Sequence, residues 1–441
     1  MALFKEILSL GLKYPKVFLE NINRENWYKL RQAMVNEPPT VILKNIKKYF
    51  WNAREVSPEK SITKITHFVD QLKYTNKEIY LFVSHEASRT GAPLIIKKAA
   101  EIMKNNHDIQ LIFLLCKGGE IESEFSKLGP IYLLDNWNNI PHFKKELGYL
   151  LDQIGTKYDI DKAYVNSAES RQVLPSIKRR VKKVICLVHE LGTYYPSGSW
   201  KVIDDNSDIV VFPAKFVNTK AMKNYSFNKA SIVIEGQGLI KTEILEADPE
   251  TSKARVRKEL NIPENSKIVL GCGTPIPRKG IDIFTFTAIN FLHQYKGSEP
   301  VYFIWLGDGD LNDYKIWVQR DIDQCDYRKN ILLVGNKKDT IPWFLGSDLF
   351  FMCSRGDPYP CVVHEAMAAG LPIIGFEDTG GFCEIINKNN GVILPFGDII
   401  KVVSFIDTYL KQYPNTKFKH DKKKFAKDYS FESYAENLFK L

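Results

Sequence analysis

Two acidic residues in the last third of the chain, Asp357 and Glu365, have seven residues between them. The segment between them leads into a helical pattern, which predicts that Asp357 lies in a loop and Glu365 in a helix. Carboxylates in these two positions can bind different hydroxyls of one ligand. The first N–H groups of a helix have no intrahelical partner, so the backbone at Cys361 and Val362 would suit a phosphate. The pattern predicts a ligand that carries both hydroxyls and phosphates.

Two adjacent cations, Arg278 and Lys279, stand between the strand-like run KIVLGCG and a helical pattern that begins after Gly280. A planar guanidinium, an ammonium and a helix N-terminus together can clamp a diphosphate. A solvated Arg-Lys pair is the alternative interpretation. The position between a strand and a helix favours the diphosphate site.

The first half of the chain contributes two loops of similar kind. Gly91, in the loop SHEASRTGAP, allows close approach of a ligand to the backbone at a helix start. His189 follows the strand-like run VICLV and can exchange hydrogen bonds with a sugar or phosphate. A structural role is the alternative for each. Arg89, Asn166 and Arg171 are further candidates at the rim of the same domain.

Strand-like apolar runs alternate with helical stretches in two consecutive series. The alternation predicts an α/β fold with two doubly wound parallel sheets covered by helices. In such sheets ligands bind at the carboxyl ends of the strands, so the site is expected in a cleft between the two domains. The runs are 79–84, 109–115, 131–134, 162–166, 184–188, 209–212 and 231–235, then 267–273, 301–307, 331–335, 349–353, 372–376 and 391–395.

The domain organisation expected from these patterns has four parts. A helical extension occupies 1–60, a first Rossmann-like domain 61–245 and a second Rossmann-like domain 246–428. The last segment, 429–441, is expected to be a helix that packs back toward the first domain. The extension mixes apolar helical spacing with Lys and Arg, so it could lie on an anionic membrane surface or pack on the main body.

Composition narrows the classes of protein. The 441 residues are 44% hydrophobic and 26% charged, which is typical of a globular protein with more than one core. No run is long enough to span a membrane, and seven scattered cysteines indicate a reducing compartment, so we expect a cytoplasmic protein, peripheral on the inner membrane face. The net charge of +9 is compatible with phosphorylated substrates. Nucleic-acid binding is disfavoured because its short recognition motifs are absent.

The residues around the two carboxylates resemble a known family signature. Asp357, seven residues, Glu365 and then AMAAGLPIIGFEDTGG resemble the retaining, nucleotide-sugar-dependent glycosyltransferases of family four, also described as glycosyl transferases group 1. HEASRTGAP, LVHE, PRKG and the pair Gly380-Gly381 resemble the other blocks of that family in the same order. The resemblance covers about 78–440 and implies the GT-B fold, with 61–245 as the acceptor-side domain and 246–428 as the nucleotide-sugar-binding domain. It places Arg89, Asn166 and Arg171 on the acceptor side.

The resemblance implies roles for individual residues. Arg278 and Lys279 would bind the donor diphosphate, and Glu365 would hold the ribose hydroxyls. Asp357 would contact the transferred sugar, and His189 would approach it near the reacting carbon. The remaining donor-side residues are Gly91, the backbone at Cys361 and Val362, and Asn336 and Lys337, which are expected to edge the base.

The same resemblance implies the partners and the chemistry. The donor would be a nucleotide-diphosphate sugar, and the acceptor a glycan or lipid-linked glycan in cell-surface polysaccharide biosynthesis. Neither a cofactor nor a metal is expected. The first acidic position is commonly Glu in the family and is Asp357 here, which puts the identity of the sugar in doubt. The sequence Asp308-Gly309-Asp310 resembles the D-x-D of metal-dependent transferases, and we interpret it as a strand-to-helix turn.

Two other functions stay open on the sequence. Nucleotide-sugar epimerases share the two-domain fold and would convert the donor without an acceptor. A non-catalytic, membrane-bound scaffold would bind a nucleotide and release no product.

Overall fold

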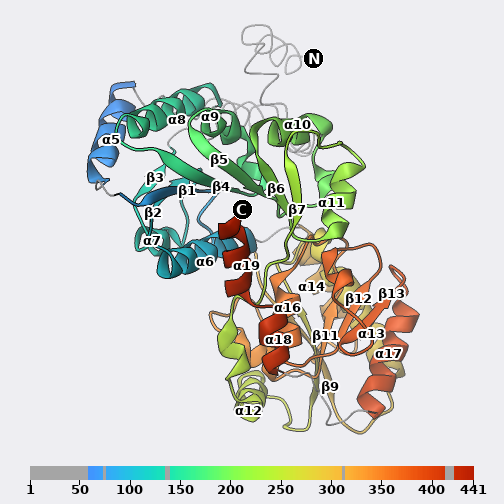
Figure 1. Cartoon of the computed structure of the whole chain (residues 1–441). Coiled ribbons are helices and arrows are strands. Elements are labelled where there is room, and N and C mark those ends of the chain that lie inside the picture. The colour runs from blue at the N-terminus through green and yellow to red at the C-terminus, as the bar shows by residue number, and fades with distance from the viewer. Residues whose placement is uncertain (1–57, 73–75, 135–139, 310–312, 413–421) are drawn as a thin grey trace, which may run out of the picture.

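The computed structural model describes residues 58–441 except 73–75, 135–139, 310–312 and 413–421. The helices expected within residues 1–57 therefore lie outside the described residues. The described chain contains two parallel sheets, stacked one above the other in Figure 1. The predicted α/β class with two doubly wound sheets is confirmed.

The first sheet has seven parallel strands in the order β3-β2-β1-β4-β5-β6-β7. Alternate residues of β1 enter different cores: Ile79, Leu81 and Val83 face one core, and Tyr80 and Phe82 face the other. Because both faces are covered, the strand is apolar throughout. The strands are β1 Glu78–Ser84, β2 Ile109–Leu115, β3 Ile131–Leu133, β4 Ile160–Asn166, β5 Val181–Leu187, β6 Ile209–Phe212 and β7 Ser231–Ile234.

Helices cover both faces of this sheet. One face carries α5 Pro58–Gln71, α8 Ile140–Gly155, α9 Leu174–Lys178, α10 Ser197–Asn206 and α11 Lys215–Met222. The other carries α6 Gly91–Asn106, α7 Glu122–Ser126 and α19 Phe431–Lys440. Figure 1 shows α19, at the extreme carboxyl end, beside α6 of the upper domain.

The second sheet has six parallel strands in the order β10-β9-β8-β11-β12-β13. They are β8 Lys267–Cys272, β9 Val301–Leu306, β10 Ile331–Leu333, β11 Leu349–Met352, β12 Ile373–Phe376 and β13 Gly391–Leu394. Helices α12 Pro249–Leu260, α15 Ile341–Leu345, α16 Cys361–Ala368 and α18 Lys422–Asp428 pack on one face, and α13 Ile281–Gln294, α14 Asp313–Gln324 and α17 Ile399–Gln412 pack on the other.

The chain passes between the two sheets twice, and the two crossings lie side by side. The first follows β7, and the second joins α18 to α19. Leu239 of the first crossing donates its N–H to the carbonyl of Tyr429 in the second at 2.8 Å and forms a parallel bridge with Ser430. A Cβ on Gly238 would lie 2.3 Å from the Tyr429 carbonyl oxygen, so this close approach requires glycine.

Within the described part of the chain, no helix combines the length and the apolar character needed to cross a membrane. All seven cysteines are free thiols.

The C-terminal helix should contribute strongly to the stability of the first domain. Leu438 is fully buried against the first-domain core, and Tyr164 donates its hydroxyl to the Leu438 carbonyl at 3.0 Å. We expect Leu438→Ala to lower the free energy of unfolding by about 2–5 kcal/mol, because it leaves a cavity. Chemical denaturation measures this, with exposed Lys440→Ala as the matched control. Equal stability of the two variants would contradict the packing described.

Candidate donor and acceptor site

The turn after β8 places Arg278 and Lys279 beside the start of α13. Gly280, which ends the turn, has φ +75°, and a Cβ there would lie 2.2 Å from the Cys353 carbonyl oxygen. Only glycine fits both constraints. The turn is thereby packed against the end of β11, which leads into the loop that carries Asp357.

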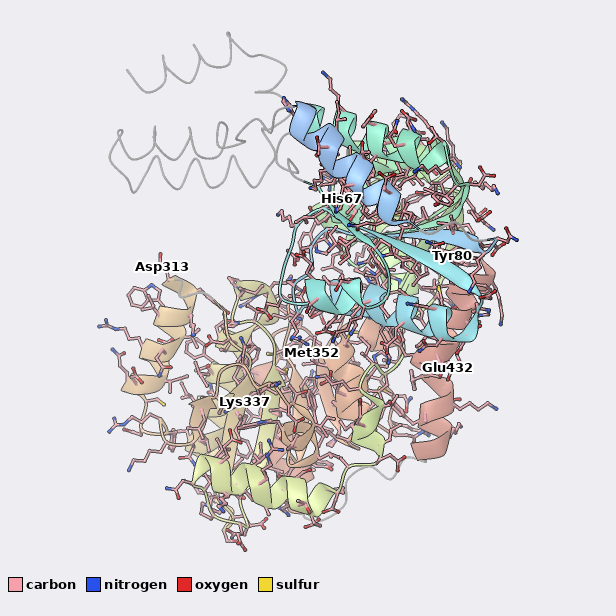
Figure 2. The ribbon with its side chains drawn as sticks, turned by 90° about the vertical axis from the view of Figure 1, so that its left-hand side faces the viewer. His67, Tyr80, Asp313, Lys337, Met352 and Glu432 are labelled. Atoms are coloured by element: carbon pink, nitrogen blue, oxygen red, sulfur yellow. The ribbon has the colours of Figure 1, made fainter. Side chains whose placement is uncertain are left out.

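Asp357 and the two cations come together at the carboxyl edge of the second sheet. The Lys279 ammonium hydrogen-bonds the nearly buried Asp357 carboxylate, and Arg278 Nη1 lies 3.6 Å from it. Arg278 also donates to the carbonyl of Gly356 at 2.9 Å. In Figure 2 the labelled Met352, the last residue of β11, lies on the side of its domain that faces the other domain. The structure thus brings three of the expected site residues into direct contact.

Arg355 connects the two loops and had no role in the sequence interpretation. Its backbone N–H donates to the Arg278 carbonyl at 2.8 Å, and its guanidinium donates to the Pro277 carbonyl at 2.7 Å. The guanidinium also forms a bidentate pair with Asp282, at 2.8 and 2.6 Å. The hydrogen bonds to Asp282 are the largest cause that raises the pKa of Arg355, and Tyr314 contributes less. The guanidinium therefore stays charged.

The helix α16 begins at Cys361, as the sequence predicts, and carries Glu365 into a nearly buried position. Burial raises the pKa of Glu365, whereas Lys241 and the Thr340 hydroxyl lower it. Burial also raises the pKa of the Cys361 thiol to about 12, so this cysteine at the helix start is neutral. The N-terminus of α16 therefore presents backbone N–H groups with no anionic sulfur among them.

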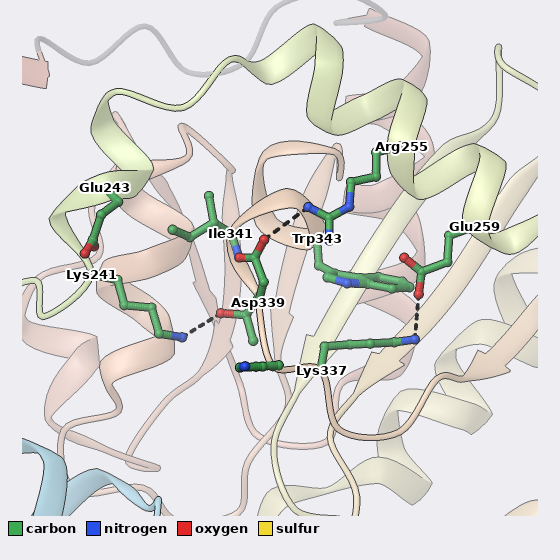
Figure 3. A pocket seen from close by; sticks show the side chains of 10 residues that line it. Lys241, Glu243, Arg255, Glu259, Lys337, Asp339, Ile341 and Trp343 are labelled. Atoms are coloured by element: carbon green, nitrogen blue, oxygen red, sulfur yellow. Dashed lines mark hydrogen bonds and ion pairs between the residues drawn. The ribbon is translucent and has the colours of Figure 1, made fainter. Parts of the chain in front are cut away.

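An open pocket of about 640 Å³ lies next to Glu365. Figure 3 shows Lys241 reaching in from one side, and Lys337 paired with Glu259 on the other at 2.7 Å. Lys337 also lies over the Trp343 ring, 5.0 Å from its centroid. Asn336 does not line this pocket; it accepts a hydrogen bond from the Asp308 N–H at 2.8 Å. The pocket is lined by Lys241, Glu243, Arg255, Glu259, Lys337, Lys338, Asp339, Thr340, Ile341 and Trp343.

Asp308 belongs to the turn after β9. Its carboxylate pairs with Lys315 and accepts the N–H of Gly309 at 2.8 Å. Asp310 lies outside the described residues. The Asp308 contacts are those of a turn that leads into α14, in line with the sequence interpretation.

His189 follows β5 in the first domain and is oriented by Asn166. Asn166 is buried, donates its amide to the Ala92 carbonyl at 3.0 Å and presents its Oδ1 to His189 Nε2 at 2.7 Å. In this arrangement Nε2 carries the proton and Nδ1 can accept one. Burial, and then the nearby His85, lower the pKa of His189 to about 3, so the imidazole is neutral at pH 7.

Glu190 supports this arrangement and was missed, although it stands next to His189 in the sequence. Its carboxylate accepts hydrogen bonds from the Ser167 hydroxyl and from the N–H groups of Ala168 and His189, both at 3.0 Å. Ser167 has φ +76°, which is rare for a residue other than glycine. Glu190 therefore ties the loops after β4 and β5 together.

The other expected first-domain residues occupy separate places. Gly91 is the first residue of α6, and a Cβ there would meet no protein atom within 4 Å. Arg89 is exposed and pairs with Glu124 at 2.7 Å. Arg171 lies over the Tyr195 ring, 5.1 Å from its centroid. The assignment of Gly91 to the donor phosphate, and of Arg89, Asn166 and Arg171 to the acceptor side, stays a prediction.

The two domains touch beside Asp357. A Cβ on Gly356 would lie 2.7 Å from Leu191 and 3.5 Å from the Tyr194 hydroxyl, both just beyond His189 in the chain. Gln237 of the first crossing donates to the Tyr359 carbonyl at 2.6 Å. The acidic loop of one domain thus faces the histidine loop of the other.

Comparison with known proteins indicates the class of protein to which this fold and site correspond. Residues 252–428 match the family model described as "Glycosyl transferases group 1". This match covers the second domain, which is similar to these glycosyltransferases, and the chain has the GT-B fold.

Solved structures share this fold over most of the chain. HepE of Anabaena, solved in complex with UDP and glucose, superposes with a TM-score of 0.70 at 15% identity, over 82% of this chain and 98% of that one. The apo lipopolysaccharide outer core galactosyltransferase WaaB superposes with a TM-score of 0.61 at 14% identity, over 82% and 100%. At these identities the likeness concerns the fold.

Curated relatives match over shorter stretches. A UDP-Gal:alpha-D-GlcNAc-diphosphoundecaprenol alpha-1,3-galactosyltransferase of Escherichia coli is 28% identical over 153 residues, which are 34% of this chain and 38% of that protein. The lipopolysaccharide core biosynthesis glycosyltransferase LpsE of Rhizobium meliloti is 27% identical over 142 residues, 32% and 39% respectively. The aligned part thus spans less than half of each of these two relatives.

Gly280 and Gly91 should respond differently to substitution by alanine, because the fold requires glycine at the first position and not at the second. We expect Gly280→Ala to lower the thermal midpoint clearly, because φ +75° and the Cys353 carbonyl both exclude a Cβ. Gly91→Ala should keep or slightly raise the midpoint, because the helix position is open and alanine favours helix. Thermal unfolding of both variants decides this, and a large loss of stability in Gly91→Ala would contradict the open space described.

The neutral state of His189 should appear in the pH dependence of stability. In the unfolded chain it binds a proton near pH 6.5 and in the folded chain near pH 3, so its contribution disfavours folding increasingly as the pH falls below 6.5. We expect His189→Gln to lose about 1 kcal/mol less stability than wild type between pH 7.5 and 5. Denaturation at both pH values measures the difference, and parallel losses would contradict the pKa.

Proposed function

We propose that this chain transfers a sugar, with retention of configuration, from a nucleotide-diphosphate sugar to a hydroxyl of a glycan or lipid-linked glycan in cell-surface polysaccharide biosynthesis. The observation that carries the proposal is the cluster of Arg278, Lys279 and Asp357 beside the N-terminus of α16. The names of the relatives, which act in lipopolysaccharide and polysaccharide assembly, support the choice of acceptor.

The cluster suits the charges that develop during transfer. As the bond between the anomeric carbon and the diphosphate oxygen breaks, the leaving diphosphate takes the electron pair and gains negative charge. Arg278, Lys279 and the free N–H groups of α16 would stabilise that charge. Because the charge is larger in the transition state than in the bound donor, they would lower the activation barrier of the transfer. They provide this stabilisation without a metal, and we propose a metal-independent reaction.

The other roles follow the same arrangement. The acceptor oxygen forms the new bond to the anomeric carbon on the face that the diphosphate leaves, and its proton passes to a diphosphate oxygen. Asp357 would bind hydroxyls of the transferred sugar, and the neutral His189 would accept a hydrogen bond from it through Nδ1. Glu365 would hold the ribose, Lys337 would edge the base beside the pocket, and the room above Gly91 would admit the donor phosphate. Asn336 would contribute to the base site indirectly, because it holds the turn after β9 through the Asp308 N–H.

In the cell we propose a cytoplasmic protein at the inner face of the membrane, with 1–60 as the surface that binds lipid. The support is the seven free thiols and the basic, apolar character of that segment.

The proposal is tested first by nucleotide binding. We expect at least one of UDP, GDP, dTDP, ADP and CMP to raise the thermal midpoint without added metal, because a ligand that binds only the folded state stabilises it. UDP is the first choice, since HepE was solved with it. No shift with any of the five, from a folded sample, would overturn the proposal in favour of a protein without a nucleotide site.

Loss of the ammonium should then slow the chemical step. With the nucleotide's sugars as donors, we expect Lys279→Met to lower kcat by roughly 100-fold or more, the usual effect of removing one oxyanion-stabilising donor. Lys401→Met, on the exposed face of α17, is the matched control. Unchanged kcat in Lys279→Met would refute the assigned role. Product analysis with donor alone separates transfer from epimerisation, because an epimerase needs no acceptor.

A further inference from the structure

Lys241 is held in place by the first crossing between the domains. Two residues before it, Leu239 is buried and paired with the second crossing at Tyr429 and Ser430. Directly after it, the short helix Thr242–Leu245 packs into the second-domain core through Ile244. The backbone on both sides of Lys241 is therefore fixed, which limits where its side chain can reach.

The ammonium of Lys241, the hydroxyl of Thr340 and the carboxylate of Glu365 each contact the other two. Its Nζ donates to the Thr340 hydroxyl at 2.6 Å and lies 3.2 Å from Glu365 Oε1. The Thr340 hydroxyl donates to the other carboxylate oxygen at 3.3 Å. Lys241 and Thr340 line the pocket described above. Figure 3 shows Lys241 there, with a dashed line that marks the contact of its ammonium. Both oxygens of Glu365 are thus oriented from the pocket side.

Among the residues that the structure describes, Lys241 is the one cation that forms an ion pair with Glu365. Of the other titratable groups around Glu365, the thiols of Cys361 in α16 and Cys272 at the end of β8 have pKa values raised by burial, so both are neutral. Lys279 is engaged with Asp357, and Glu243 of the short helix lines the pocket with a charge of the same sign as Glu365. A nearly buried carboxylate without a cation tends to take up a proton.

We propose that Lys241 is a positioning residue, which keeps the Glu365 carboxylate charged and oriented to accept hydrogen bonds from the ribose hydroxyls of the donor nucleotide. The inference rests on the proposed function, because it needs a nucleotide at Glu365. Since Lys241 belongs to the crossing, nucleotide affinity is also coupled to the position of the interdomain linker.

The test is UDP affinity by calorimetry at pH 6.5, 7.5 and 8.5 for wild type, Lys241→Met and Lys241→Arg. Removing the ammonium lets burial raise the pKa of Glu365 further, so more of it is protonated at low pH. We expect Lys241→Met to bind UDP roughly ten-fold more weakly at pH 6.5, with the loss shrinking toward pH 8.5. Lys241→Arg should restore most of the affinity. The ratio of variant to wild type cancels the ionisation of UDP itself.

Lys401→Met is the matched control. It removes a lysine of α17 that pairs with Asp398, and α17 packs on the face of the second sheet opposite α16, so the variant should bind UDP like wild type. If Lys241→Met does not fold, Lys241→Gln, which can still bond Thr340 but carries no charge, takes its place. A loss that is the same at all three pH values, or equal to that of Lys401→Met, would overturn the inference alone. Failure of wild type to bind any of the five nucleotides would instead overturn the proposed function, and the inference with it.

Discussion

The two adjacent chain crossings are the constraint on which the arrangement of this protein depends. Each sheet buries both of its faces, so the domains can meet only through loops and connections. The hydrogen bond from Leu239 to Tyr429 ties the connections together. Directly beyond them, α19 returns to the first-domain core and Lys241 enters the pocket of the second domain. The pairing of the two crossings therefore positions both the helix that covers one sheet and the lysine that enters the pocket beside the other.

Aromatic packing surrounds the same point. The ring of His364 lies between Tyr359 and Tyr429, with centroids 5.2 and 5.4 Å away. Burial lowers the pKa of His364 to about 4, so the ring is neutral and packs as an apolar group. Tyr359 in turn contacts Gly236 of the first crossing. Because α16 carries both His364 and Glu365, the helix that positions the Glu365 carboxylate packs directly against the two crossings.

Each carboxylate of the site is paired with a cation of the protein. Lys279 and Arg278 share Asp357, and Lys241 shares Glu365. Under the proposed function, an entering diphosphate would compete for cations that are already paired, and the sugar and ribose hydroxyls would approach carboxylates that are already oriented. Such pairing limits the desolvation cost of keeping these charges nearly buried before the donor arrives. It also means that the cations are preorganised without depending on the donor for their position.

The sequence by itself determined the alternation of strands and helices and the identity of the residues in loops after strands. Periodic apolar runs and glycines with special backbone requirements act locally, so Arg278, Lys279, Asp357 and Glu365 could be placed in the correct loops and helix. Only the tertiary structure decided which polar groups meet. Lys241 is 124 residues from Glu365 and stands in a linker without a motif, and Arg355 and Glu190 act through backbone groups of other loops. Such contacts depend on how the two sheets and their crossings pack, which local spacing does not encode.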